Sequence, residues 1–126
     1  MAERELVGKG SKEMSNTPII SYRDAKPGQF VGKLLGVKRD VGDNHKNVYT
    51  FAAVSGDLPT MVKIEKNFVP VEVGEGDKVE MWGCTVLDDR MDGAQIGDTV
   101  RIVYDGRGNK APGRQAPYMF SVYVVE

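Results

Sequence analysis

Alternating apolar and polar residues recur along most of this chain. Neighbouring side chains of a β-strand point to opposite faces, so alternation with a period of two is the pattern of a half-buried strand. Five segments alternate in this way or are rich in β-forming residues. The pattern predicts one strand in each of them: 29–39, 47–55, 78–87, 99–106 and 118–125.

The alternation also assigns side chains to the two faces of each strand. Three sets of residues share a face and are candidates for the core: Tyr49 with Phe51 and Ala53, Val100 with Ile102 and Tyr104, and Tyr118 with Phe120, Val122 and Val124. Trp82 differs, because it shares its face with the charged Glu80. A charged neighbour indicates a solvent-facing side, so we expect the Trp82 ring at the surface.

The segments between the predicted strands contain residues typical of turns. Positions 40–47 combine Asp, Gly and Asn between two apolar runs, which predicts a hairpin loop. Gly32 and Gly36 interrupt the first strand and predict bulges or tight bends there. Positions 56–77 fit either a short strand or one helical turn, and the pattern leaves that choice open.

Positions 88–97 predict a helical turn or a short helix. Asp88 is suited to cap its start, and Leu87 and Met91 are spaced four apart, as on one face of a helix. Gly97 closes the segment. The predicted helix therefore lies between the third and the fourth strand.

This order of elements is that of the OB-fold, a five-stranded, partly open barrel. The sequence thus predicts an all-β protein, a five-stranded OB-fold-like barrel with one short helix between strands 3 and 4. Other small barrels and a minimal sandwich have the same number of strands and remain alternatives. Residues 1–17 mix charges with Gly, Ser and Asn, which predicts a flexible N-terminal arm before a single domain at 18–126.

The composition narrows the classes of function. With 126 residues, 15 Gly and 6 Pro, the chain suits one β-rich domain and not a helical bundle. One cysteine, Cys84, and one histidine, His45, exclude an internal disulfide and the usual zinc sites. Neither has a partner for nucleophilic or acid–base chemistry nearby in the sequence, so we expect no enzyme activity, no metal and no cofactor. No apolar run reaches the roughly 18 residues of a membrane span, so we expect a soluble protein.

The net charge is −1, but the charges are unevenly distributed. Segments 57–80 and 88–98 carry −3 each, whereas segment 101–117 carries +3. Cations on a flexible loop can contact successive phosphates and release their counterions, so loop 107–117 is a candidate for binding nucleic acid. The alternative is a solvated hairpin loop whose charges only keep it soluble.

Aromatic rings would complete such a site, because a base stacks on a ring for roughly 1 to 3 kcal/mol whatever its identity. The candidate rings lie on the predicted strands. For the tyrosines, the alternative to stacking on bases is a place in the core. The candidate cations lie in or beside the two long loops. The full set of candidate nucleic-acid-binding residues is Arg39, Lys46, Tyr49, Trp82, Arg101, Tyr104, Arg107, Lys110, Arg114 and Tyr118.

Three stretches resemble the small OB-fold single-stranded DNA-binding proteins of bacteriophages and prophages: WGCTVLDDRM (82–91), IGDTVRIVYDGRGNK (96–110) and PYMFSVYV (117–124). The resemblance implies a non-catalytic protein that binds single-stranded DNA in replication or recombination, in the cytoplasm of a bacterial host. RNA, a second copy of the chain and other replication or recombination proteins remain open as partners. The acidic segment 57–77 departs from the family pattern. The alternative function is a small β-barrel module for protein interaction or virion assembly.

Overall fold

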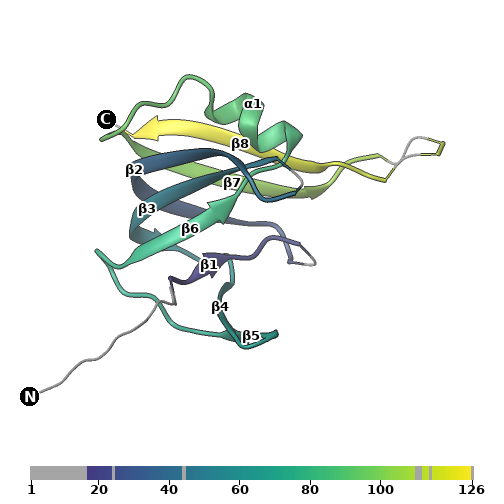
Figure 1. Cartoon of the computed structure of the whole chain (residues 1–126). Coiled ribbons are helices and arrows are strands. Elements are labelled where there is room, and N and C mark those ends of the chain that lie inside the picture. The colour runs from purple at the N-terminus through teal and green to yellow at the C-terminus, as the bar shows by residue number, and fades with distance from the viewer. Residues whose placement is uncertain (1–16, 24, 44, 110–111, 114, 126) are drawn as a thin grey trace, which may run out of the picture.

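The computed structural model describes residues 17–125 except positions 24, 44, 110, 111 and 114. It contains one sheet and one short helix (Figure 1). The elements are β1 (Ile19–Ile20), β2 (Gly28–Val41), β3 (Lys46–Gly56), β4 (Thr60–Ile64), β5 (Asn67–Pro70), β6 (Lys78–Trp82), α1 (Thr85–Met91), β7 (Thr99–Arg107) and β8 (Tyr118–Val125). The predicted arm at 1–17 lies outside the described residues, apart from position 17.

The sheet has eight strands in the order β5-β4-β1-β6-β3-β2-β7-β8. All neighbouring strands are antiparallel except β1 and β6, which are parallel. The all-β prediction is confirmed, and β2, β3, β6, β7 and β8 lie where the five strands were predicted. The five-stranded barrel is wrong, because the sheet is open and gains β1, β4 and β5. A strand of two residues is too short to leave a pattern in the sequence, and segment 56–77 folds as a hairpin of two short strands.

The chain leaves the sheet earlier than predicted after β6. The strand ends at Trp82 and α1 begins at Thr85, so the predicted strand to position 87 is too long. The amide of Gly83 still donates to the carbonyl oxygen of Asn47, at 2.7 Å, and the chain then turns into the helix. Asp88 does not cap the helix: Cys84 is the N-cap residue, and Asp88 lies in the first turn.

All the buried hydrophobic side chains except Val48 form one cluster, to which every strand that the sequence predicted contributes. Leu87 and Met91 of α1 are buried in it, as their spacing predicted. The faces predicted for β3 and β7 are confirmed, whereas Val124, at 48% exposure, is not part of the core. The bulges predicted in the first strand are also confirmed, since the β2–β3 register shifts at Gly32 and Gly36.

The side chain of Tyr22, just after β1, bridges two strands that do not pair with each other, β6 and β8. Its ring lies 4.8 Å from the ring of Phe120 and 5.2 Å from that of Tyr118, both on β8. Its hydroxyl donates to the backbone carbonyl oxygen of Trp82 on β6, at 2.9 Å. An aromatic side chain therefore connects the two sides of the open sheet where backbone pairing does not.

Candidate functional site

The base of the loop between β7 and β8 holds a cation on an aromatic ring. Arg107 and Tyr118 are partners in the β7–β8 register, and the Arg107 guanidinium lies 4.3 Å from the centre of the Tyr118 ring. Nε and Nη2 of Arg107 also donate to the carbonyl oxygen of Ala116, at 2.8 and 2.5 Å. Arg107 is exposed and Tyr118 half-buried. This Arg107–Tyr118 pair presents a positioned positive charge and part of a ring to solvent.

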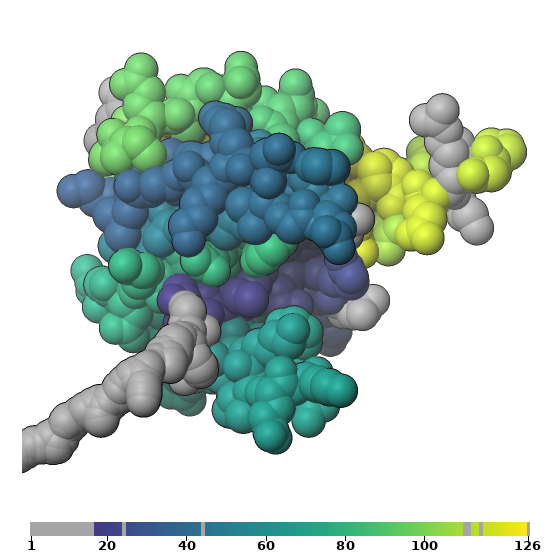
Figure 2. Space-filling model, viewed as in Figure 1, coloured from purple at the N-terminus to yellow at the C-terminus, as the bar shows by residue number. Residues whose placement is uncertain are grey.

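Trp82, at the end of β6, is 37% exposed, as its charged neighbour predicted. It opens onto a concave surface of about 510 Å³, which we call the Trp82 groove. The residues that line the groove come from β1 and the residues after it, from the β4–β5 hairpin and from β6: Ile19, Ile20, Ser21, Tyr22, Arg23, Met61, Lys63, Phe68 and Trp82. In Figure 2 the purple β1 segment lies at the surface between the strands above it and the teal β4–β5 hairpin below it.

The groove is aromatic and basic. Among the described residues that line it, the charged ones are Arg23 and Lys63, and both are cations. The Lys63 ammonium lies 5.9 Å from the centre of the Phe68 ring, and the two residues are partners in the β4–β5 register. Phe68 is 58% exposed. The groove thus combines two exposed rings with positive charge, which suits flat anionic ligands.

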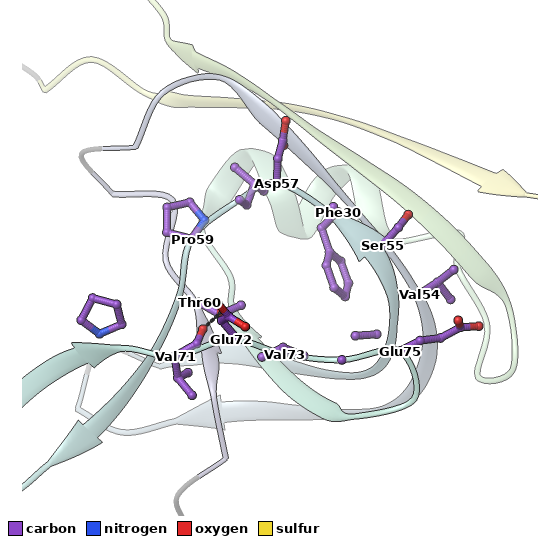
Figure 3. A pocket seen from close by; sticks show the side chains of 15 residues that line it. Phe30, Val54, Ser55, Asp57, Pro59, Thr60, Val71, Glu72, Val73 and Glu75 are labelled. Carbon is purple, nitrogen blue, oxygen red and sulfur yellow. Dashed lines mark hydrogen bonds between the residues drawn. The ribbon is translucent and has the colours of Figure 1, made fainter.

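A second concave surface, of about 490 Å³, has the opposite charge (Figure 3). The ring of Phe30 points into it, and the charged side chains around it are Asp57, Glu72 and Glu75. Carboxylates repel a polyanion, so this surface is unsuited to nucleic acid. Segment 57–77 therefore contributes charges of opposite sign to the two cavities: Lys63 lines the Trp82 groove, and three of its carboxylates line the other.

Several of the predicted site residues are brought to one end of the sheet. Trp82 and Tyr118 lie on two sides of Tyr22, which touches both. Figure 1 shows the β2–β3 turn, the end of β6 and the β7–β8 hairpin at this same end. Arg39, which is exposed, and the half-buried Lys46 flank that turn.

Two of the four predicted stacking rings are sealed in the core. Tyr49 is 3% exposed and Tyr104 is 1% exposed, so neither ring has an open face for a base. The hydroxyl of Tyr49 donates to Asp88 Oδ1 at 2.7 Å. The ring of Tyr104 packs against that of Phe120, with centres 5.2 Å apart. For these two tyrosines the core alternative is correct, because each ring lies on the inner face of its strand.

The remaining predicted cations are not all in the same place. Arg101 lies on the opposite face of β7 from Tyr104, and its guanidinium is 4.4 Å from the centre of the exposed Tyr123 ring. It is therefore separated by the sheet from the Tyr22 side. Lys110 and Arg114 lie outside the described residues, and their part in the site stays a prediction.

Two tyrosine hydroxyls, those of the partly buried Tyr22 and of Tyr49, have perturbed pKa values. Burial raises the pKa of Tyr22 well above its ordinary value of 10.0, and the neighbouring Cys84 acts in the same direction. Burial likewise raises the pKa of Tyr49 well above 10.0, together with the hydrogen bond to Asp88. Both hydroxyls therefore remain neutral hydrogen-bond donors at physiological pH and hold β6 and α1 in place.

Four residues of this surface were not among those predicted from the sequence: Tyr22, Arg23, Lys63 and Phe68. A signal for one of them was present, because Lys63 lies two positions after Met61 on the same strand and both line the Trp82 groove. Tyr22 and Arg23 had no such signal, since they follow a strand of two residues. Their position is decided by the pairing of β1 with β4 and β6.

Within the described part of the chain, no group of three or more His, Cys, Asp or Glu side chains comes together in a way that could hold a metal ion. His45 Nδ1 contacts the carboxylate of Asp40 within the β2–β3 turn, and both side chains are exposed. None of the helical segments in the described ranges is both long and apolar enough for a membrane span.

Comparisons with other proteins identified no relative of this chain. No family model matches the chain, and neither a curated protein nor a solved structure is significantly similar to it.

Proposed function

We propose that this protein binds single-stranded DNA without catalysis. The observation that carries the proposal is the position of Tyr22, whose hydroxyl donates to the backbone carbonyl oxygen of Trp82 and whose ring packs on that of Tyr118. The exposed Trp82 ring and the Arg107–Tyr118 pair consequently belong to one end of the molecule. Rings that can stack on bases and a cation that can contact phosphates therefore lie at the same end of the sheet.

This combination favours an unpaired strand over a duplex. The bases of a single strand expose their faces, which stack on aromatic side chains, whereas the base faces of a duplex are already stacked. Lys46, Arg107 and the cations of loop 107–117 would neutralise backbone phosphates. No acidic residue of segment 57–77 lines the Trp82 groove, and three of them line the other cavity.

The pairing of the five predicted strands supports an OB-fold-like connectivity within the open sheet of eight strands. β2, the first of the predicted strands, pairs with both β3 and β7, and α1 lies between β6 and β7. An OB-fold has its first strand in the same central position and its helix between the third and fourth strands. Here β1 pairs with the edge of β6 that β3 leaves free. Tyr22 spans the remaining opening between β6 and β8.

A titration with oligo-dT tests the proposal. Trp82 is the single tryptophan of the chain, so its fluorescence reports on this surface alone. We expect quenching that saturates and that weakens as salt is raised. Oligo-rU and a DNA duplex of the same length serve as comparisons. An unchanged signal and no binding by fluorescence anisotropy at low salt would overturn the proposal in favour of a protein-interaction module.

A further inference from the structure

We infer that the Trp82 groove is a second base-stacking subsite, in which an unpaired base packs on Phe68 of the β4–β5 hairpin and its phosphates contact Lys63 and Arg23. The inference deepens the proposed function and depends on it. It extends the binding surface from β8, across Tyr22 and Trp82, to the opposite edge of the sheet at β5.

The exposure of Phe68 is the first argument. Its side chain is 58% exposed on β5, an edge strand of four residues that are all exposed. An exposed phenylalanine there contributes little to the core, because burial is the source of its stabilising energy. The ring lines the same groove as Trp82, so a ligand in the groove reaches both rings.

The second argument is the repeated pairing of a cation with a ring. Lys63 lies 5.9 Å from the centre of Phe68 at one end of this surface, and Arg107 lies 4.3 Å from the centre of Tyr118 at the other. A strand that stacks a base on a ring brings the adjoining phosphate within reach of the cation beside it. Both ends therefore offer the same pair of contacts.

Charge selects the occupant of the groove. Its charged lining residues among those described are Arg23 and Lys63, whereas the neighbouring cavity has three carboxylates and no cation among its lining residues. A polyanion is attracted to the first surface and repelled by the second. The volume of the Trp82 groove, about 510 Å³, lies within the range of sites that hold small molecules. These properties fit a nucleotide of a single strand better than an apolar protein segment.

Two substitutions test the subsite, each with a matched control. Phe68→Ala removes the ring, and Phe68→Leu keeps apolar volume while removing the aromatic face. Tyr123→Ala removes a comparably exposed ring from β8, outside the groove. Lys63→Glu reverses a charge in the groove, and Lys66→Glu reverses an exposed charge in the adjoining turn that does not line it. Thermal unfolding of each variant checks that the fold is retained.

The measurement is the affinity for oligo-dT of about 6 and about 20 nucleotides, lengths that bracket a typical single-domain site. For the longer oligonucleotide we expect Phe68→Ala and Phe68→Leu to weaken binding about 5-fold or more, the loss of one stacked base. Lys63→Glu should weaken it at least as much and reduce the salt dependence. Tyr123→Ala and Lys66→Glu should bind within about twofold of the unmodified protein.

The possible results separate the two proposals. If the unmodified protein binds oligo-dT but the Phe68 and Lys63 variants bind equally well, the subsite is wrong and the proposed function stands. If the unmodified protein binds no oligo-dT of either length, both are wrong. If Phe68→Ala leaves affinity unchanged but dissociates an oligomer in analytical ultracentrifugation, the groove is an interface between copies of the chain and the subsite is overturned.

Discussion

The hydroxyl of Tyr22 donates a 2.9 Å hydrogen bond to the backbone carbonyl oxygen of Trp82, although the two residues are 60 positions apart in the sequence. The Tyr22 ring simultaneously packs on Phe120 of β8. One side chain thus links the end of β6, which carries the exposed tryptophan, to the β7–β8 hairpin. Changing it should affect both stability and the Trp82 surface.

Substitution of Tyr22 separates these two effects. Tyr22→Phe removes the hydrogen bond and should lower the free energy of unfolding by about 1 kcal/mol. Tyr22→Ala also removes the ring contacts with β8 and should cost about 2 to 4 kcal/mol. Urea denaturation measures both values. Equal stability of the Tyr22→Ala variant and the unmodified protein would mean that Tyr22 does not connect the two sides of the sheet.

Substitution of Tyr49 tests whether this residue belongs to the core or to the binding surface. Its ring is sealed, and its hydroxyl donates to Asp88. Tyr49→Phe should lower the free energy of unfolding by about 1 to 2 kcal/mol, because the bond to a carboxylate is lost. Affinity for oligo-dT should stay unchanged, since no open ring face is altered. A weaker affinity in a normally folded Tyr49→Phe variant would show that this ring does contact the strand.

Alkaline pH should destabilise the fold. The pKa values of Tyr22 and Tyr49 are raised in the folded protein above their ordinary value of 10.0. The folded state therefore keeps two protons that the unfolded state releases near pH 10. Their stabilising contribution is complete below pH 10 and is lost as the pH rises above it.

Thermal unfolding between about pH 8 and about pH 11 measures this loss. The double variant Tyr22→Phe and Tyr49→Phe should show a smaller fall in melting temperature across this interval, whatever its starting value. An equal fall in both proteins would assign the pH dependence to other groups.

A side chain at position 83 should destabilise the fold. A Cβ atom there would lie 2.1 Å from Asp88 Oδ1 and 3.2 Å from the carbonyl oxygen of Asn47. Gly83→Ala must displace the carboxylate that accepts the bond from Tyr49, so we expect a loss of about 1 to 3 kcal/mol. Gly36→Ala is the control, because a Cβ at that position meets nothing within 4 Å. Similar denaturation midpoints for the two variants would contradict this account of the turn after β6.

The β7–β8 loop should contribute affinity without sequence selectivity. Replacing Arg107, Lys110 and Arg114 together with Ala should weaken binding to all single-stranded sequences alike. It should also reduce the slope of log affinity against log salt by about 2, because three phosphate contacts are lost. An equivalent triple variant of exposed lysines on other strands and turns is the control: Lys33, Lys66 and Lys78. If both variants lose affinity equally, overall charge and not the loop determines binding.

The strands that the sequence predicted are those with a sustained local pattern. Phe51, Val100 and Ile102 alternate with polar or half-buried neighbours over strands of nine or more residues, and all three are 0% exposed. Alternation records which face of a strand is buried, so it can be recognised without knowing what the face packs against. For the same reason Glu80 correctly indicated that the Trp82 ring is exposed.

Alternation cannot say which inner-face rings are fully enclosed. Tyr104 and Tyr118 occupy equivalent inner positions on β7 and β8, yet the first is 1% exposed and the second half-buried. The difference arises because Tyr104 is enclosed by the core, whereas Tyr118 lies at the base of the loop against Arg107. Burial of an aromatic ring thus depends on neighbours contributed by other parts of the chain.

The sequence by itself determined the β-rich class, the five principal strands, the helix between the third and fourth of them, and the outward face of Trp82. These follow from local patterns of a few residues. Tertiary structure alone decided the open sheet of eight strands, the bridging position of Tyr22, and the division of charge between Lys63 and the carboxylates of segment 57–77. Those features depend on pairings such as β1 with β6, between residues about 60 positions apart, which no local pattern encodes.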